Sequence, residues 1–284
     1  MRGILGAMMT RRSALLLPLG APLTAAPLPQ DALQPRLRWL PRPLFNGAPV
    51  LFRSTGYVGP ALWLSRNIEF RPDADGFSAL AGVDLSCPPG AYPLTLGSEK
   101  VSVPVVARSY PTSTITVPQK FVAPPPGTRA RILRESAIKR RVFEASPRER
   151  SWRSPFTAPA NTRYTSSFGV RRTYNGMTQS VHQGLDYSAA FGTEISAANS
   201  GRVVIAREMY FEGGFIAIDH GESIFTLYMH LSEFLVREND SVVTGALIAK
   251  SGSSGRATGP HLHFAVRWQG IYLEPGTLVT LWHD

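Results

Sequence analysis

Turn-forming residues are spread along this chain and divide it into short apolar runs. The sequence has 24 prolines and 25 glycines among its 284 residues. Proline interrupts helices and glycine favours turns, so this composition predicts many short strands rather than long helices. A chain of 284 residues also exceeds one typical core, which predicts two compact units with connecting material between them. The expected fold class is therefore all-β.

The first unit is expected at residues 35–117. Turn-rich segments such as 72–76 and 88–90 separate its apolar runs. Many short strands at this spacing predict a small Ig-like β-sandwich. No acid pair or histidine cluster lies in it, so we interpret it as a binding or spacing module. The candidate strands are residues 48–52, 61–64, 68–70, 92–96, 101–106 and 114–117.

Residues 118–155 are expected to form a linker, proline-rich at first and basic afterwards. Its stretch 127–153 carries nine Arg or Lys and three Glu, a net +6 of the chain's +10. The spacing of five apolar residues predicts one face of a short amphipathic helix. Two interpretations are open: an electrostatic tether to anionic wall polymers, or a solvated linker helix. The five residues are Ile132, Leu133, Ile138, Val142 and Phe143.

The N-terminus has the three parts of a secretory signal peptide, expected at residues 1–28. Arg11 and Arg12 precede an apolar run at 14–23, and small residues follow at 24–26. The run is too short and too proline-rich to span a bilayer as a stable helix. We therefore expect export to the periplasm or the extracellular cell wall, with no stable membrane insertion.

The route of export is left open by the same segment. Thr-Arg-Arg-Ser at 10–13 is similar to a twin-arginine signal, although Ala14 stands where a bulky apolar residue is usual. Met8 and Met9 are alternative starts.

The single cysteine, Cys87, excludes an intramolecular disulfide. A lone cysteine can be a catalytic thiol. Because Cys87 stands at a strand end before Pro-Pro-Gly, we interpret it instead as a small packed side chain.

The second unit is expected at residues 156–284 as a mostly antiparallel β domain, with a hairpin turn at 219–222. All six histidines lie in it, which suggests a metal or acid–base site. The candidate strands are residues 201–206, 215–219, 223–228, 247–250 and 262–266.

The strongest pair of histidines is His261 and His263. On a strand, residues two apart point to the same face, so both imidazoles are expected to project together with Leu262 turned away. Two aligned histidines suit a zinc site. Two polar residues on a wet sheet face would give the same pattern.

A second element is His182 with Asp186. Gly184 between them disfavours a helix, so a turn or irregular strand is expected to bring the two side chains together. With His263 they supply three protein ligands, and three ligands plus water is the catalytic zinc arrangement. A structural site would be closed by four ligands, often cysteines.

Several short motifs together resemble the LytM/lysostaphin-like M23 zinc peptidases over about residues 156–275. They are Phe-Gly-Val-Arg at 168–171, His-x-x-x-Asp at 182–186, Gly-Thr-Glu-Ile at 192–195, Gly-Arg-Val at 201–203, Ile-Asp-His-Gly at 218–221, Tyr-x-His-Leu at 228–231 and Gly-Pro-His-Leu-His-Phe at 259–264. Departures are few: Asn239 replaces a usual glycine in a turn, and Ser254 replaces a usual threonine. The first unit resembles the Ig-like domain that precedes some cell wall metallopeptidases.

The resemblance implies a role for each residue of the site. His182, Asp186 and His263 would ligate one Zn²⁺ per chain. His230 and His261 would be the catalytic pair: one takes the proton from the zinc-bound water and the other stabilises the oxyanion, with His261 favoured as the base.

Other polar residues of this unit receive lesser roles. Tyr174, Asn175 and Tyr210 lie in segments that could wall a substrate groove. His220, in a turn, and His283, beside the C-terminus, are interpreted as structural.

The expected function is therefore a zinc metalloendopeptidase that hydrolyses peptide cross-links of bacterial peptidoglycan. The alternative is a non-catalytic wall-binding regulator of other wall hydrolases with the same fold. A nucleic-acid partner is not expected, because the export signal removes the chain from nucleic acid and the charge lies in a linker. D-Ala–diaminopimelate, polyglycine and other bridges all occur as substrates in this family, and the sequence does not choose among them.

Overall fold

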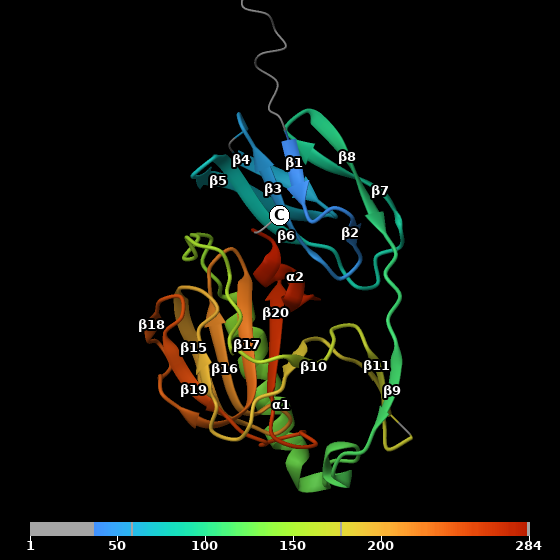
Figure 1. Ribbon diagram of the computed structural model, residues 1–284, viewed down its shortest axis with the longest axis vertical. Helices are drawn as coiled ribbons and strands as arrows, with labels where there is room; N and C mark the ends of the chain where they lie inside the picture. The colour runs from blue at the N-terminus through green and yellow to red at the C-terminus, as the bar shows by residue number, and fades with distance from the viewer. Residues whose placement is uncertain (1–36, 58, 177, 283–284) are drawn as a thin grey trace, which may run out of the picture. The chain divides into compact units, whose positions relative to one another are not determined.

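A computed structural model describes residues 37–57, 59–176 and 178–282 (Figure 1). Strands predominate in them, as the composition predicts. The expected signal peptide at 1–28 and His283 lie outside the described residues. None of the described helices combines the length and apolar character needed to cross a bilayer.

Eight strands between residues 37 and 106 form one sheet in the order β1-β3-β6-β5-β4-β7-β8-β2. Five of the six strands predicted in the first unit coincide with its members. Cys87 packs against the core of this sheet, as its interpretation as a packed side chain requires. The strands are β1 (Leu37–Leu40), β2 (Leu44–Phe45), β3 (Pro49–Ser54), β4 (Gly59–Trp63), β5 (Arg66–Asp73), β6 (Gly76–Gly82), β7 (Gly90–Leu96) and β8 (Glu99–Val106).

Strand β5 connects the two halves of this sheet. Residues 66–70 of β5 pair with β4, whereas 71–73 pair with β6. Trp63 on β4 is fully buried, and its ring meets Phe52 on β3 edge-on at 5.2 Å between centroids. The indole Nε1 of Trp63 donates to the carbonyl oxygen of Gly82 at 3.0 Å. Trp63 therefore joins strands that are not neighbours in the sheet.

The sixth predicted strand does not join this sheet. It forms β9 (Thr112–Ile115), which pairs in parallel with β11 (Arg171–Tyr174), itself the hairpin partner of β12 (Thr178–Val181). The strand is thus present, but it pairs outside the segment 35–117, because local sequence patterns do not specify pairing with a strand about 60 residues away.

The linker contains two 3₁₀ turns, η2 (Gln119–Phe121) and η3 (Pro126–Thr128), and the helix α1 (Arg129–Glu144). Ile138, Val142 and Phe143 share one face of this helix, as predicted, and they pack against apolar residues of the C-terminal half of the chain. Leu133 is 60% exposed, so its assignment to this face was wrong. At about 100° per residue, Leu133 lies about 180° around the helix from Val142.

The remaining strands, except the β9-β11-β12 group, form a ten-stranded sheet with the main order β10-β13-β20-β17-β16-β15-β18. β14 pairs with β19, β19 with β17, and β21 with β20. The bounds are β10 (Tyr164–Ser166), β13 (Leu185–Tyr187), β14 (Glu194–Ser196), β15 (Gly201–Met209), β16 (Gly213–Asp219), β17 (Ile224–Phe234), β18 (Ser241–Val242), β19 (Leu247–Ser251), β20 (Leu262–Trp268) and β21 (Ile271–Leu273), followed by α2 (Pro275–Thr280).

Both faces of this sheet are covered, and side chains alternate between them. Phe225 and Leu227 of β17 belong to the cluster that α1 covers, whereas Tyr228 belongs to the larger core on the opposite face. The predicted hairpin turn after Asp219 is present, with Gly221 at φ 79°. Asn239 has φ 78°, so it adopts the left-handed backbone that its turn requires.

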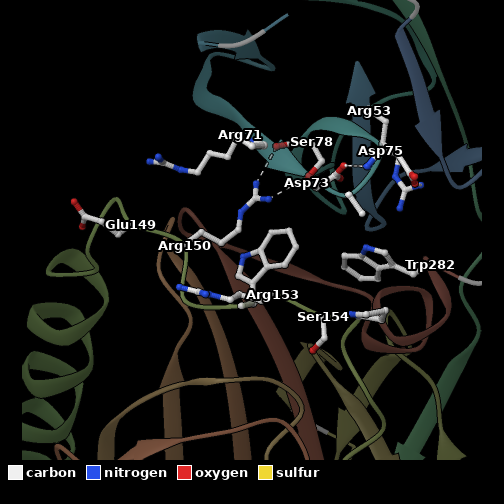
Figure 2. A pocket seen from close by; sticks show the side chains of 14 residues that line it. Arg53, Arg71, Asp73, Asp75, Ser78, Glu149, Arg150, Arg153, Ser154 and Trp282 are labelled. Carbon is white, nitrogen blue, oxygen red and sulfur yellow. Dashed lines mark hydrogen bonds and ion pairs between the residues drawn. The ribbon is translucent and has the colours of Figure 1, made fainter. Parts of the chain in front are cut away.

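The segment after α1 contacts the first sheet through Arg150, as Figure 2 shows. The Arg150 guanidinium donates to the hydroxyl and the carbonyl oxygen of Ser78 at 3.1 and 2.9 Å, and to Glu222 at 3.0 Å. A hollow of about 560 Å³ lies beside these contacts, with Trp282 in its wall. No histidine lines it, so it is not the site that the motifs predict.

His220 offers a test of the packing of the second sheet. It is fully buried: its Nδ1 lies 2.8 Å from the Ser200 carbonyl oxygen and its Nε2 2.8 Å from the Thr226 hydroxyl. Burial lowers its pKa from 6.5 to about 4. The unfolded chain therefore takes up a proton below pH 6.5, while the folded chain resists it until about pH 4. This contribution to stability is complete above pH 6.5 and is lost as the pH falls towards 4.

We expect the free energy of unfolding to fall between pH 7 and pH 4.5, with a His220 share on the order of 2–3 kcal/mol. His220→Gln should reduce this pH dependence and also lower stability at pH 7. Urea unfolding of both proteins at the two pH values measures it. Parallel pH profiles for the two proteins would contradict the structural role of His220.

Candidate metal centre

The site is built on two neighbouring strands, β13 and β20. They pair antiparallel, and the register places Asp186 directly opposite His263. His182 precedes β13 in a non-helical segment, as Gly184 predicts. Its backbone N–H donates to the Val170 carbonyl oxygen at 2.8 Å, which ties this segment to the β11 hairpin.

Three side-chain atoms converge here. Asp186 Oδ1 lies 2.9 Å from His182 Nε2 and 2.8 Å from His263 Nδ1, and the two nitrogens are 3.0 Å apart. Ligands in a tetrahedron with bonds of about 2.0–2.1 Å are spaced by about 3.3 Å. The donor set of two imidazoles and one carboxylate, with no thiolate, suits a zinc site with a free position. Among the described residues, no other group of this kind is found.

Further hydrogen bonds orient these three side chains. His182 Nδ1 donates to the Ser167 carbonyl oxygen at 2.7 Å, which leaves Nε2 with its lone pair towards the site. Arg172 Nη2 donates to Asp186 Oδ2 at 2.6 Å and to the Ser166 hydroxyl at 2.6 Å. Arg172 therefore holds one carboxylate oxygen while the other faces the two histidines. Burial by itself would raise the pKa of Asp186, but the hydrogen bonds to His182 and His263 hold it far below its usual range.

Gly184 makes room for this arrangement. A Cβ atom at this position would lie 2.5 Å from His263 Nε2 and 2.7 Å from the Phe264 carbonyl oxygen. The backbone oxygen cannot easily move, so a side chain here would displace the His263 ring or the strand.

Two further histidines face the triad. His261 donates from Nδ1 to the Gly259 carbonyl oxygen at 2.8 Å, and its Nε2 lies 3.9 Å from Asp186 Oδ1. His230 donates from Nδ1 to the Ser254 carbonyl oxygen at 2.8 Å, and its ring centroid is 4.7 Å from that of His261. Burial, followed by the nearby His261, lowers the pKa of His230 to about 3. In both imidazoles Nδ1 is bonded to a carbonyl oxygen, and Nε2 has no hydrogen-bond partner among the described residues.

The predicted shared face of His261 and His263 is therefore what the structure has. Both side chains approach Asp186, while Leu262 is fully buried on the opposite side. His261 itself precedes β20 and is held by an isolated bridge to Gly252.

A cavity of about 180 Å³ adjoins these residues. Tyr174, one of the three residues expected in a groove wall, lines it. Asn175 instead bonds both backbone groups of Val117, and the Tyr210 hydroxyl donates to the Lys120 carbonyl oxygen. These two residues hold the linker, and their role in substrate binding stays a prediction.

Sequence reasoning did not identify several lining residues. Arg172 directly follows the Phe-Gly-Val-Arg motif, and Arg256 lies shortly before His261. The signal that could have identified these two arginines is their position in the sequence, close to motifs of the predicted site. The sequence analysis noted Ser254 only because it replaces the threonine that is usual in the family. Its carbonyl oxygen orients His230, and its hydroxyl accepts from the Gly214 N–H at 2.8 Å.

The donor set fits a candidate metal centre. Residues 180–275 match the model of Peptidase family M23, so the chain contains an M23 peptidase domain. This confirms the resemblance inferred from the motifs over most of its length; the match begins after residues 168–171.

Curated relatives match less than half of the chain. The peptidoglycan DD-endopeptidase ShyA of Vibrio cholerae is 34% identical over 132 residues, which cover 46% of this chain and 28% of ShyA. ShyC of the same organism, also named a peptidoglycan DD-endopeptidase, is 38% identical over 117 residues, covering 41% of this chain and 27% of ShyC. The chain thus spans less than a third of the length of these relatives.

A solved structure of an M23 peptidase candidate from Pseudomonas aeruginosa shares the fold more widely. It aligns with a TM-score of 0.64 over 84% of this chain and 96% of its own, at 22% identity. The likeness therefore extends beyond the M23 domain into the first half of the chain.

Gly184→Ala tests the packing around the triad. The added methyl should push His263 aside and weaken zinc binding at least about tenfold. Competition with a chromophoric chelator measures the affinity. Gly127→Ala is the matched control, since nothing lies within 4 Å of its added Cβ. Equal zinc affinity in both variants would show that Gly184 is not needed for the arrangement.

Arg172→Met tests the anchoring of Asp186. Loss of the guanidinium should free the carboxylate to rotate and weaken zinc binding about 10- to 100-fold. Arg171→Met, at an exposed neighbouring position on β11, should leave the affinity unchanged. The same chelator competition gives the answer, and an unchanged affinity for Arg172→Met would refute the anchoring role.

Proposed function

We propose that this protein is a zinc-dependent endopeptidase that hydrolyses peptide cross-links of bacterial peptidoglycan. The observation that carries the proposal is the convergence of His182, Asp186 and His263 beside two further histidines with unbonded Nε2 atoms. The names of the M23 relatives ShyA and ShyC support a cell wall substrate. Relatives named DD-endopeptidases favour cleavage between two D-centres.

In this mechanism, His182, Asp186 and His263 hold the zinc. When bound, zinc lowers the pKa of a coordinated water to about 7 and polarises the scissile carbonyl. His261 acts as the base, because its Nε2 is 3.9 Å from a ligand oxygen and carries a lone pair. It takes a proton from the attacking water and then passes this proton to the leaving amine.

His230 stabilises the oxyanion that forms on the carbonyl. Its Nδ1–H bond to the Ser254 carbonyl oxygen fixes the ring and turns Nε2 towards the site, and Nε2 donates to the oxyanion only in the state in which it has taken up a proton. The carbonyl oxygens of Gly259 and Ser254 thus fix which nitrogen of each catalytic histidine faces the substrate.

The rest of the chain would bring this domain to its substrate. We propose export by the N-terminal signal to the periplasm or cell wall, and an Ig-like spacer or binding module in residues 35–117. The exposed face of α1 is proposed to attract anionic wall polymers. Its exposed cations include Arg129, Arg134, Arg140 and Arg141.

His261→Ala tests the catalytic role separately from zinc binding. We expect it to lower the release of muropeptides from purified peptidoglycan by about 10²- to 10⁴-fold, because the base is lost. Its zinc content should remain one per chain. Chelator should stop the wild type and added zinc should restore it. Mass spectrometry of the products identifies the cleaved bond.

Two results would count against this function. Full activity of His261→Ala would remove the proposed base. A zinc-loaded wild type that releases nothing would favour the alternative, a wall-binding regulator.

A further inference from the structure

Arg256 is the side chain that the mechanism leaves unused in the cavity beside the metal centre. It lies in the loop between β19 and β20, and it lines the same cavity of about 180 Å³ as His182, His230 and His263. A cavity of this size spans only one or two residues of an extended peptide at about 3.3–3.6 Å per residue. The guanidinium therefore lies within reach of groups next to a scissile bond.

The Arg256 side chain is held in place by two aromatic rings. Its guanidinium carbon lies 4.6 Å from the ring centroid of Tyr174 and 5.3 Å from that of Phe211. Its backbone N–H donates to the Phe211 carbonyl oxygen at 2.8 Å. Because stacking uses the faces of the guanidinium, its N–H groups remain available at the edge.

The other charges that line the cavity are already paired. Arg172 is bonded to Asp186 at 2.6 Å, and Glu212 forms an ion pair with Lys139 from α1. In the part of the chain that the structure describes, Arg256 makes no side-chain hydrogen bond or ion pair. A half-buried guanidinium without an anion is an efficient site for a ligand carboxylate, since such pairs are strong and geometrically specific.

We propose that Arg256 binds a carboxylate of the substrate, carried by the residue that contributes the scissile nitrogen. This rests on the proposed function and names its substrate class. In a cross-link to diaminopimelate, which has two carboxylates, the carbon next to the scissile nitrogen bears a free carboxylate. A glycine bridge bears none at an internal bond. Arg256 therefore selects cross-links to diaminopimelate over polyglycine.

A purely structural role for Arg256, as a packing layer between Tyr174 and Phe211, makes a different prediction. Packing does not distinguish a carboxylate from a carboxamide on the ligand. The contrast between two such ligands thus separates recognition from packing.

The experiment measures binding without turnover. Zinc-loaded His261→Ala protein is titrated calorimetrically with two synthetic cross-linked peptides, D-Ala joined to diaminopimelate, that differ only in a carboxylate or carboxamide beside the scissile amide. We expect the carboxylate peptide to bind at least about tenfold more tightly. When Arg256→Gln is added to the His261→Ala protein, the preference for the carboxylate peptide should disappear. Arg256→Lys in the same protein should retain part of the preference, because lysine keeps the charge without the fork of N–H groups. Arg237→Gln, an exposed arginine outside the cavity, should leave it intact.

Equal affinity for the two peptides would overturn the proposal without requiring any Arg256 variant. A preference that survives Arg256→Gln would overturn it as well, by assigning the recognition to another group. Hydrolysis of the carboxylate peptide by the wild type is measured in parallel. If the preference is present and hydrolysis is absent, the proposed function fails while the carboxylate site stands.

Discussion

The pairing of β13 with β20 is the constraint on which the site depends. Side chains on facing residues of an antiparallel pair lie close together, so the register that sets Asp186 opposite His263 fixes two of the three candidate ligands. A slip of one residue would turn Asp186 to the other face and leave a buried carboxylate without its partners. The buried strands β16 and β17 hold this register, because β17 pairs with β20 from Ile224 to Met229.

Backbone carbonyl oxygens decide the chemistry of the histidines around this pair. The carbonyl groups of Ser167, Gly259 and Ser254 each accept from the Nδ1–H of one histidine, and each leaves the corresponding Nε2 towards the site. A carbonyl oxygen can only accept, so the tautomer is set by the fold and not by the pH. The same loop that orients His230 also carries Arg256 into the cavity. The geometry of the proposed catalysis and of the proposed substrate recognition therefore depends on one short segment.

Much of this architecture could be predicted from the sequence, since it rests on local patterns. Turn residues bounded the strands, and the two-residue period placed His261 and His263 on one face. Contacts between distant segments could not be predicted in this way. The parallel pairing of β9 with β11 and the bond from Arg172 to Asp186 depend on how loops close in three dimensions. Leu133 was misplaced for a related reason: the inward face of α1 uses the polar residues Glu135 and Lys139, which bind the loop at Tyr210 to Glu212.

Zinc-edge X-ray absorption on the purified full chain tests the central claim most directly. The account predicts one zinc per chain, with a shell of nitrogen and oxygen at about 2.0–2.1 Å that contains two imidazoles and no sulfur. His263→Ala should lose the metal or show a single imidazole. A wild-type protein that takes up no zinc, or a spectrum unchanged by the loss of His263, would contradict the account.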